Sequence, residues 1–421
     1  MYIEEFSKLK KSEHNMVNSD YGYDHMVYVR LFEGCNLFCE HCFIPSNPKK
    51  IQESFYENKN LTQELIKNNV PTGSKLYLQW HGGEPTILGV DYLKKAIENV
   101  ESDSRFTYKH GIQTNLLNFS TNTNEWVKLY KEKFGNQLGV SWDYGIRHIK
   151  NNQLTAKESN EKFEEIFWKN IALAKDYGLE LYMVVTVTKL FFEHFKNPFD
   201  FFDIMQKNGI EKLNFERITK TGFARNSWDK LGLSNLEYST NMAKFFKAYI
   251  VFKNNNPDSL IQISPFDGLL DSVIGLNNDE KNQSNNPEKW DILSYKNQGY
   301  GCWNGSCDTK FHTIDANGYK KGCTALNSEE DNKNKDLSKT IKIESIKWVK
   351  KSSQSEDLTS DVNSFQELRN TRQKSCVGCE FLSICSSGCL SVEKFDESEE
   401  CSGAKFLFET IHNTVIRQFA F

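Results

Sequence analysis

The stretch from His25 to Cys42 reads HMVYVRLFEGCNLFCEHC and is the strongest indication of the fold. Its first eight residues have the apolar, aromatic and β-branched character of a strand. Three cysteines follow in the spacing C-x-x-x-C-x-x-C, at Cys35, Cys39 and Cys42. Three thiolates on one short loop can ligate three irons of a four-iron cluster and leave the fourth iron open for a ligand. A zinc knuckle completed by His41 is the alternative, which we disfavour because zinc sites usually have a second C-x-x-C pair nearby.

Strand and helix patterns alternate after this stretch, as in proteins built from βα units around a parallel sheet. Five more short apolar runs are strand candidates, at 75–80, 109–114, 137–142, 180–188 and 211–218. Helical periodicity occurs at 91–100, 124–134 and 162–177, and we expect another helix at 231–252. The six βα units make three-quarters of an eight-unit barrel. The sequence therefore predicts the α/β class and a partial (β/α)6 TIM barrel, with the chemistry at the carboxyl ends of its strands.

The composition excludes several classes of protein. With 421 residues, 38% hydrophobic and 26% charged, the chain is long enough for two or three domains and is neither a membrane protein nor a disordered one. A formal net charge of -4 offers no broad basic face, so we expect no nucleic-acid partner. The N-terminal residues MYIEEFSKLKKSEH lack the apolar core of a secretion signal, and no stretch approaches the ~20 apolar residues of a membrane span. We therefore expect a cytoplasmic protein without a membrane partner.

The 11 cysteines are too many for an ordinary reduced enzyme and are unevenly spread. After the first three, the other eight all lie between Cys302 and Cys401. Disulfides alone would leave one thiol over, and a chain with no export signal should not depend on them. Because clustered thiolates suit zinc or iron-sulfur centres, we interpret these cysteines as metal ligands.

Small and polar residues follow several predicted strands. The stretch WHGGEP, residues 80–85, comes after the second strand, and its paired glycines allow a ligand to approach the backbone closely. Asn115 follows the third strand and Ser141 ends the fourth, where small polar groups can hold a nucleoside or a carboxylate. Glu216 and Arg217 end the sixth strand and face either the active site or solvent.

The cysteine motif after the first strand of a partial barrel resembles the radical S-adenosylmethionine (SAM) enzymes. The resemblance implies that the open iron of a cluster at the first three cysteines binds SAM, and that the reduced cluster releases a 5'-deoxyadenosyl radical. Gly82, Gly83, Glu84 and Pro85 match the G-G-E-P motif of the family, which binds the amino group of SAM. By the same resemblance Ser141 and Arg147 hold SAM, although the usual S-x-D-G-P turn is replaced by Ser-Trp-Asp-Tyr-Gly, and Asn115 is a further cofactor-binding candidate.

The C-terminal cysteines resemble the SPASM extension of radical SAM enzymes, which carries two auxiliary four-iron clusters. The resemblance implies that one auxiliary cluster is held by Cys302, Cys307, Cys323 and Cys389, and the other by Cys376, Cys379, Cys385 and Cys401. All 11 cysteines then have a role, in three four-iron clusters. A four-thiolate zinc site at Cys376, Cys379, Cys385 and Cys389 is the alternative, but it leaves the other four C-terminal cysteines unexplained.

The predicted organisation has three parts: a radical SAM partial barrel at 1–230, a linker and helical bridge at 231–300, and an iron-sulfur SPASM domain at 301–421. Polar inserts at 277–297 and 327–364 are typical of exposed loops. Only some 25 residues precede the first strand, too few for a leader-recognition domain. We therefore expect any leader peptide to bind elsewhere on the chain or to another protein.

The resemblance implies an oxidoreductase that modifies a peptide or protein side chain and receives electrons from a donor such as a flavodoxin or ferredoxin. Anaerobic sulfatase maturases, which make formylglycine, place an aspartate, regarded as their base, after the cysteine that corresponds to Cys323. This chain has Thr324 there, and a hydroxyl is a poor base at neutral pH. We therefore favour cross-linking of a ribosomally made peptide over sulfatase maturation, and we leave the catalytic base unknown. The same residues would also suit a SPASM enzyme with a small-molecule substrate, a zinc-stabilised non-catalytic binding protein or an iron-sulfur electron carrier.

Overall fold

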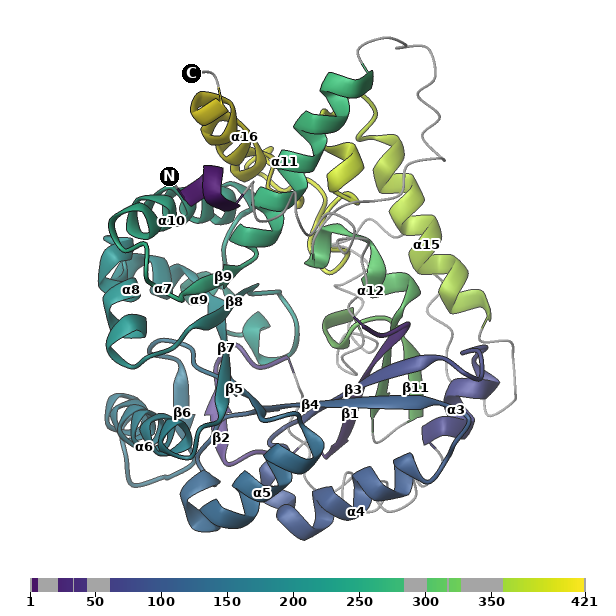
Figure 1. Ribbon diagram of the computed structural model, residues 1–421, viewed down its shortest axis with the longest axis vertical. Helices are drawn as coiled ribbons and strands as arrows, with labels where there is room; N and C mark the ends of the chain where they lie inside the picture. The colour runs from purple at the N-terminus through teal and green to yellow at the C-terminus, as the bar shows by residue number, and fades with distance from the viewer. Residues whose placement is uncertain are drawn as a thin grey trace.

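The computed structural model describes residues 2–6, 22–32, 34–43, 61–283, 301–315, 318–326 and 359–419. A curved nine-stranded sheet lies at its centre, with the order β11-β10-β1-β3-β4-β5-β7-β8-β9 (Figure 1). Neighbouring strands are parallel throughout, except that β10 and β11 are antiparallel. The strands are β1 (His25–Phe32), β3 (Lys75–Gly82), β4 (Thr107–Thr114), β5 (Gln137–Ser141), β7 (Glu180–Val187), β8 (Lys212–Arg217), β9 (Gln262–Ser264), β10 (Phe311–Asp315) and β11 (Gly318–Lys321).

The six predicted strands are all present, as β1, β3, β4, β5, β7 and β8. In the described part of the chain the sheet stays open, because β9 and β11 form its two edges and do not pair with each other. The predicted fold class, an α/β partial barrel, is therefore confirmed. Alternation along β3 shows how the strands are oriented: Leu76, Leu78 and Trp80 are buried on the helix side, whereas Tyr77 and Gln79 lie on the partly exposed interior side.

Helices cover the outer face of the sheet (Figure 1). The helices of the described residues, those outside this layer included, are α3 (Leu61–Lys67), α4 (Val90–Glu101), α5 (Thr123–Lys133), α6 (Ala156–Asp176), α7 (Lys189–His194), α8 (Pro198–Lys207), α9 (Trp228–Leu231), α10 (Asn235–Asn255), α11 (Phe266–Gln283), α12 (Ser306–Thr309), α15 (Thr359–Lys374) and α16 (Lys405–Phe419). The two longest, α6 and α10, each begin with a capping box, in which Thr155 pairs with Glu158 and Ser234 with Glu237. These reciprocal hydrogen bonds satisfy backbone N–H groups that the first helical turn leaves unpaired.

Phenylalanines dominate the core between the last parallel strands and the helices. Phe191, Phe201, Phe215 and Phe245 are buried, and their ring centroids lie 5.4 to 6.2 Å apart. Burial of a phenylalanine side chain stabilises a fold by roughly 1.5–3 kcal/mol, and edge-to-face pairs add to this. This cluster fixes α7, α8 and α10 against β8.

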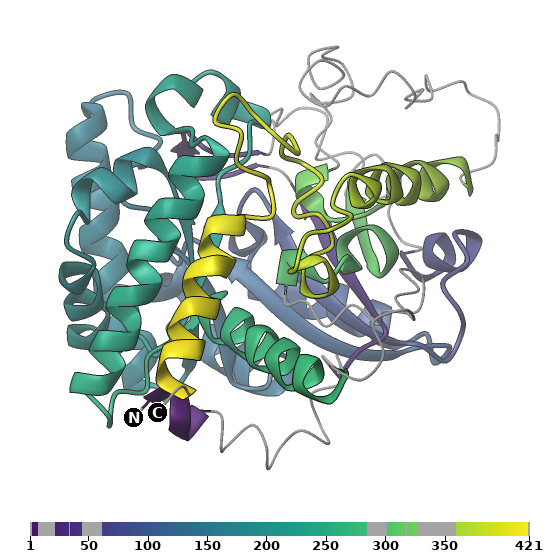
Figure 2. The ribbon, with the colours of Figure 1, turned by 90° about the horizontal axis from the view of Figure 1, so that it is seen from above.

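The C-terminal segment extends the same sheet as the N-terminal one. β10 pairs with β1, and β9, which lies between the sixth unit and the C-terminal cysteines, pairs with β8. α16 packs between α10 and α11 (Figure 2). The predicted domain boundaries at residues 230 and 300 therefore stay a prediction, and the parts that they separate contribute strands to one sheet. Most of the two predicted polar inserts, 284–297 and 327–358, lies outside the described residues.

None of the helices in the described ranges combines the length and the apolar character that a bilayer crossing requires.

Candidate functional site

The three N-terminal cysteines lie on one loop after β1. The loop contains a short strand, β2 (Leu37–Cys39), which pairs antiparallel with β6 (Arg147–Ile149) and places Cys39 opposite Arg147. The N–H of Cys42 donates to the carbonyl of Cys39 at 3.1 Å, which closes a turn between these two cysteines. The Cys35 sulfur accepts hydrogen bonds from the Leu37 N–H at 3.3 Å and from the Asn115 side-chain amide at 3.8 Å. Donors aimed at a sulfur are typical of thiolates that ligate iron.

Gly82 brings the end of β3 against the cysteine loop. Its φ of +133° lies in the region that favours glycine, and a Cβ atom there would lie 2.0 Å from the Phe32 carbonyl oxygen. The Gly83 N–H donates to the same carbonyl at 2.8 Å, and the Glu84 N–H donates to the Gly34 carbonyl at 2.9 Å. The G-G-E-P stretch is therefore held directly beside the loop that carries the three cysteines.

Glu84 is 1% exposed and its carboxylate joins the ends of β3 and β4. Oε1 accepts from the Thr86 N–H at 3.0 Å, the Thr86 hydroxyl at 2.6 Å and the Thr114 hydroxyl at 2.7 Å, and Oε2 accepts from the Asn115 N–H at 2.7 Å. Burial raises the pKa of Glu84, and these four hydrogen bonds act against that rise. Because all four donors belong to the protein, this side chain positions the two strand ends, and Pro85 begins the 3-10 turn (Pro85–Leu88) that follows it.

The predicted polar residues of β4 and β5 lie side by side. The Asn115 side-chain amide donates to the Asn36 side-chain oxygen at 2.7 Å, which links β4 to the cysteine loop. Ser141 accepts a hydrogen bond of 2.8 Å from Gln113 across the two neighbouring strands. The structure therefore brings Asn115 next to the cysteines and Ser141 to the adjacent strand end.

Arg147 belongs to a buried network that the sequence did not reveal. Asp143, which has no exposed surface, accepts from the Thr186 N–H at 2.5 Å and contacts Arg147 Nη2 at 2.5 Å and His41 Nε2 at 2.9 Å. Burial alone would raise the pKa of Asp143, but Arg147 and His41 hold it well below its usual range. In the described part of the chain, the buried Nδ1 of His41 and Nε of Arg147 have no hydrogen-bond partner. Both atoms lie next to the cysteine loop, as donors for a bound group would.

Four of the C-terminal cysteines surround one small pocket. Cys376, Cys379, Cys385 and Cys401 line it together, and we call them the Cys376 set. Gly403 lies between two of them, because a Cβ atom at this glycine would lie 2.7 Å from the Cys385 sulfur and 3.6 Å from the Cys401 sulfur. Only a residue without a side chain leaves this space free for a group between the sulfurs.

The other four C-terminal cysteines also approach one another. We call Cys302, Cys307, Cys323 and Cys389 the Cys302 set. The N–H of Cys323 donates to the carbonyl of Cys307 at 3.1 Å, and Cys323 packs against the small cluster of Phe365 and Leu390, the latter being the neighbour of Cys389. Cys302 is exposed, and desolvation by its neighbours, followed by the charges of Glu216 and the other three thiols, raises its pKa. The Cys376 set lines one pocket, whereas the assignment of the eight cysteines to two clusters stays a prediction.

The chemistry of the three cysteine groups fits iron-sulfur clusters. Burial raises the pKa of Cys35 to about 11 and that of Cys39 well above its usual value, so both are neutral thiols until a metal replaces the proton. Within the described ranges, no three His, Cys, Asp or Glu side chains converge closely enough to hold a single metal ion. The thiolates of a four-iron cluster bind different irons and therefore surround a larger volume than the ligands of one ion.

The interior of the barrel contains one carboxylate at the end of β8. Glu216 points to the interior side, as its strand neighbour Thr186 does, and accepts a hydrogen bond of 2.5 Å from Asn214. Desolvation raises the pKa of Glu216 and the hydrogen bond from Asn214 acts against that rise, although the residue is exposed. Tyr28 lies near both Glu216 and Cys323, since both influence its pKa. Glu216 of β8 and Cys323 of the Cys302 set therefore both act on the same tyrosine of β1.

Thr324 is tied to a buried arginine. Arg30 of β1 is 1% exposed, and its Nη1 donates to the Thr324 hydroxyl at 3.3 Å. The residue after Cys323 therefore accepts a hydrogen bond from a cation, which opposes a role as base.

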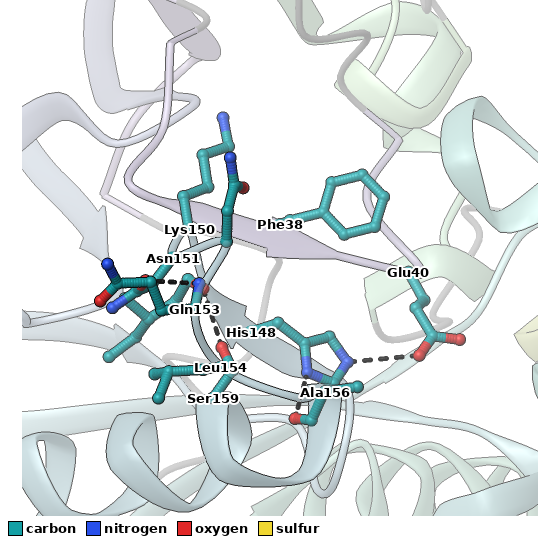
Figure 3. Close-up of a pocket in the computed structure, with 11 residues that line it drawn as sticks. Phe38, Glu40, His148, Lys150, Asn151, Gln153, Leu154, Ala156 and Ser159 are labelled. Atoms are coloured by element: carbon teal, nitrogen blue, oxygen red, sulfur yellow. Dashed lines mark hydrogen bonds and ion pairs between the residues drawn. The ribbon is translucent and has the colours of Figure 1, made fainter.

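A surface pocket of about 980 Å³ opens beside the paired strands β2 and β6 (Figure 3). Phe38, the neighbour of Cys39, is 48% exposed at its edge. The His148 ring lies between the Ala156 carbonyl, 3.0 Å from Nδ1, and the Glu40 carboxylate, 3.2 Å from Nε2. The outer face of the cysteine loop is therefore open at Phe38.

Comparison with known proteins finds matches in sequence. Residues 29–202 match the radical SAM superfamily. The chain is 24% identical over 362 residues, 84% of each chain, to a cysteine-type anaerobic sulfatase-maturating enzyme of Clostridium novyi.

Two solved structures share the fold. The anSMEcpe enzyme with bound AdoMet and the Kp18Cys peptide superposes with a TM-score of 0.56 at 17% identity, covering 94% of this chain and 98% of that one. Streptococcus suis SuiB bound to its precursor peptide SuiA superposes with a TM-score of 0.51 at 16% identity, covering 92% and 75%. Residues 29–202 therefore match the radical SAM superfamily, and the chain as a whole is similar in sequence to the anaerobic sulfatase maturases.

Proposed function

We propose that this chain is a radical SAM oxidoreductase that forms a cross-link in a ribosomally made peptide. The observation that favours this over formylglycine formation is Thr324, whose hydroxyl accepts a hydrogen bond from Arg30 where the maturases carry an aspartate. When bound, SAM and the iron-sulfur clusters supply a radical that removes a hydrogen atom from the peptide and a redox centre that accepts the second electron.

Residues at the carboxyl ends of β1, β3, β4 and β5 would hold the cofactors of the first step. Cys35, Cys39 and Cys42 would ligate the SAM-binding cluster. The backbone of Gly82 and Gly83 would face the amino group of SAM, and Glu84 would keep this backbone in place through its hydrogen bonds to β4. The candidates for the rest of SAM are Asn115, Ser141 and Arg147, and the unpartnered Nε of Arg147 supports the last of these.

The two C-terminal cysteine sets would each hold an auxiliary four-iron cluster. With four thiolates each, such clusters have no open iron and would carry electrons rather than bind substrate. We place the Cys302 set nearer the proposed proton acceptor Glu216, which is among the groups that raise the pKa of Cys302.

Glu216 is the side chain that we propose as the acceptor of the proton that the peptide loses. It is a carboxyl group on the interior side of the barrel, and a raised pKa makes a carboxylate a stronger base. Glu216 accepts a hydrogen bond from Asn214, whereas the carboxylates of Glu84 and Asp143 each contact three or more protein groups.

A flavodoxin or ferredoxin would supply the electron for SAM cleavage. Such a donor needs a short path to the first cluster, and Phe38 is exposed one residue away from Cys39. A cytoplasmic location, where such donors occur, suits this requirement.

Sulfatase maturation is the second candidate function, and the match to the Clostridium novyi enzyme over 84% of each chain favours it. A zinc-stabilised binding protein is the non-catalytic alternative. Iron, labile sulfide and SAM cleavage in the purified protein would exclude that alternative.

The test is anaerobic co-expression of the enzyme with each short peptide encoded beside its gene, followed by mass spectrometry of the peptide. We expect a loss of two hydrogens that is absent with Cys39→Ala. An unchanged peptide mass, in a preparation that still cleaves SAM, would refute peptide cross-linking, and conversion of a sulfatase Cys or Ser to formylglycine would establish the second candidate.

A further inference from the structure

Helix α15 carries two buried arginines one turn apart. Arg369 is 6% exposed and Arg372 is 5% exposed. In Figure 2 the helix runs along the side of the molecule, next to the loops that carry the C-terminal cysteines. Full burial of a guanidinium is costly unless its donors find strong acceptors, so the partners of these two residues indicate their role.

Arg369 contacts a cysteine sulfur directly. Its Nη2 donates to the Cys307 sulfur at 3.1 Å, while its Nη1 donates to the carbonyls of Ser386 and, at 3.5 Å, of Gly388. Gly305, at the start of α12, has a φ of +75° and packs closely on this region, because a Cβ atom there would lie 3.0 Å from the hydroxyl of Ser386, whose carbonyl accepts from Arg369. The guanidinium therefore bridges Cys307 and the loop before Cys389.

Arg372 contacts the same region without touching a sulfur. It donates to the carbonyl of Cys389 at 2.9 Å and to that of Val392 at 2.8 Å. A guanidinium keeps its proton in proteins. Arg372 thus stays protonated at neutral pH and adds a second positive charge beside the Cys302 set.

We propose that Arg369 raises the reduction potential of the iron-sulfur cluster held by the Cys302 set, by donating a hydrogen bond to the Cys307 sulfur. This inference rests on the proposed function, in which that set ligates an auxiliary cluster. One-electron reduction adds a negative charge to a cluster and its thiolates, and a buried cation with an N–H aimed at a ligand sulfur stabilises that charge. The cluster thereby becomes a better acceptor for the electron that the peptide loses.

The test is an EPR-monitored redox titration of the full chain with Cys35, Cys39 and Cys42 changed to Ala, which leaves only the auxiliary clusters. In this background we compare Arg369→Met, which removes the charge and the donor, with Arg369→Lys, which keeps the charge. Arg417→Met, at an exposed site in the last turn of α16, is the control. Iron and sulfide content of each variant are measured first.

We expect one of the two auxiliary potentials to become more negative in Arg369→Met, less so in Arg369→Lys, and neither to change in Arg417→Met. Two unchanged potentials in an Arg369→Met protein with full iron content would overturn the proposal. If that variant does not retain iron, the parent protein is labelled with 15N-arginine, and the contact between an arginine and a cluster is tested in it instead. A 15N hyperfine coupling at a reduced auxiliary cluster is then expected, and its absence would overturn the proposal.

These outcomes separate the inference from the function on which it rests. A parent protein with all 11 cysteines that binds no iron, or that does not cleave SAM, refutes the proposed function itself. If the parent protein holds its clusters and the Arg369 variants have the same reduction potentials as the parent, only the role of Arg369 is refuted.

Discussion

Replacing Glu84 by Gln should loosen the junction between β3 and β4. Oε1 has three donors around it and Oε2 has one, the Asn115 N–H at 2.7 Å. The amide of Gln will therefore keep its oxygen at the Oε1 position and place its NH2 group against the Asn115 N–H. One hydrogen bond to a charged acceptor is lost, and a buried donor is left facing another donor.

The magnitude follows from these contacts. Loss of such a hydrogen bond with an unsatisfied buried N–H costs about 3 kcal/mol. Since 1.4 kcal/mol corresponds to a factor of ten in an equilibrium, local opening at Asn115 should become roughly 100-fold more frequent. Hydrogen-deuterium exchange of peptides that contain the Asn115 amide measures this directly.

Glu101→Gln is the matched control. Glu101, at the end of α4, is about one-third exposed and pairs with His110 and Lys133. A pair of this kind contributes about 0–1 kcal/mol, so exchange at Asn115 should change less than tenfold. Parent-like exchange of the Asn115 amide in Glu84→Gln would refute the positioning role of the carboxylate.

Three further substitutions test other contacts of the site. Gly82→Ala should lower the free energy of unfolding by about 3 kcal/mol and abolish SAM binding, because its Cβ would lie 2.0 Å from a carbonyl oxygen. Asp143→Asn should cost about 3–5 kcal/mol, because it leaves Arg147 buried without its charged partner. The pKa of Asp143 is lower in the folded state, so its contribution is complete above about pH 4 and is lost as pH falls through the folded pKa. Glu216→Gln should keep SAM cleavage but reduce product by about 100-fold or more.

Each of these has its own control. Gly73→Ala also has a positive φ, +87°, but meets no atom within 4 Å, so it should cost only about 1 kcal/mol of backbone strain. Denaturant unfolding at pH 7 and at pH 3 should show the difference between parent and Asp143→Asn shrink at the lower pH, and a difference that grows would contradict the ion pair. For Glu216→Gln, parallel loss of 5'-deoxyadenosine and product would point to a failure before proton transfer.

The strands that the sequence predicts are those with enough residues to show a pattern. All six runs of the barrel have five or more residues, whereas β2, β6 and β9 have three each and carry no readable period; β10, with five residues, was missed despite its length. The pairing of β10 with β1 joins residues nearly 290 positions apart, such as Val27 and His312, and local periodicity contains no information about such contacts.

The same limit applies to the site. The three cysteines and the G-G-E-P stretch are recognisable from the sequence, because the residues of each motif lie close together along the chain. The network of His41, Asp143 and Arg147 is not, since the antiparallel pairing of β2 with β6 brings it together. An aspartate at the end of a strand with an arginine four residues later was the available hint. Arg369 and Arg372 lie in a strongly polar helix sequence, which gave no reason to expect buried guanidinium groups.

The parallel pairing of β1 with β10 also constrains the order of events during synthesis. β1 leaves the ribosome early, but one of its two edges has no partner until β10 follows, which at typical rates takes roughly 15–60 s. An unpaired strand edge is prone to join other chains. We expect the nascent chain to need a chaperone over this interval, and a chain shortened before residue 301 to aggregate rather than form a free-standing barrel.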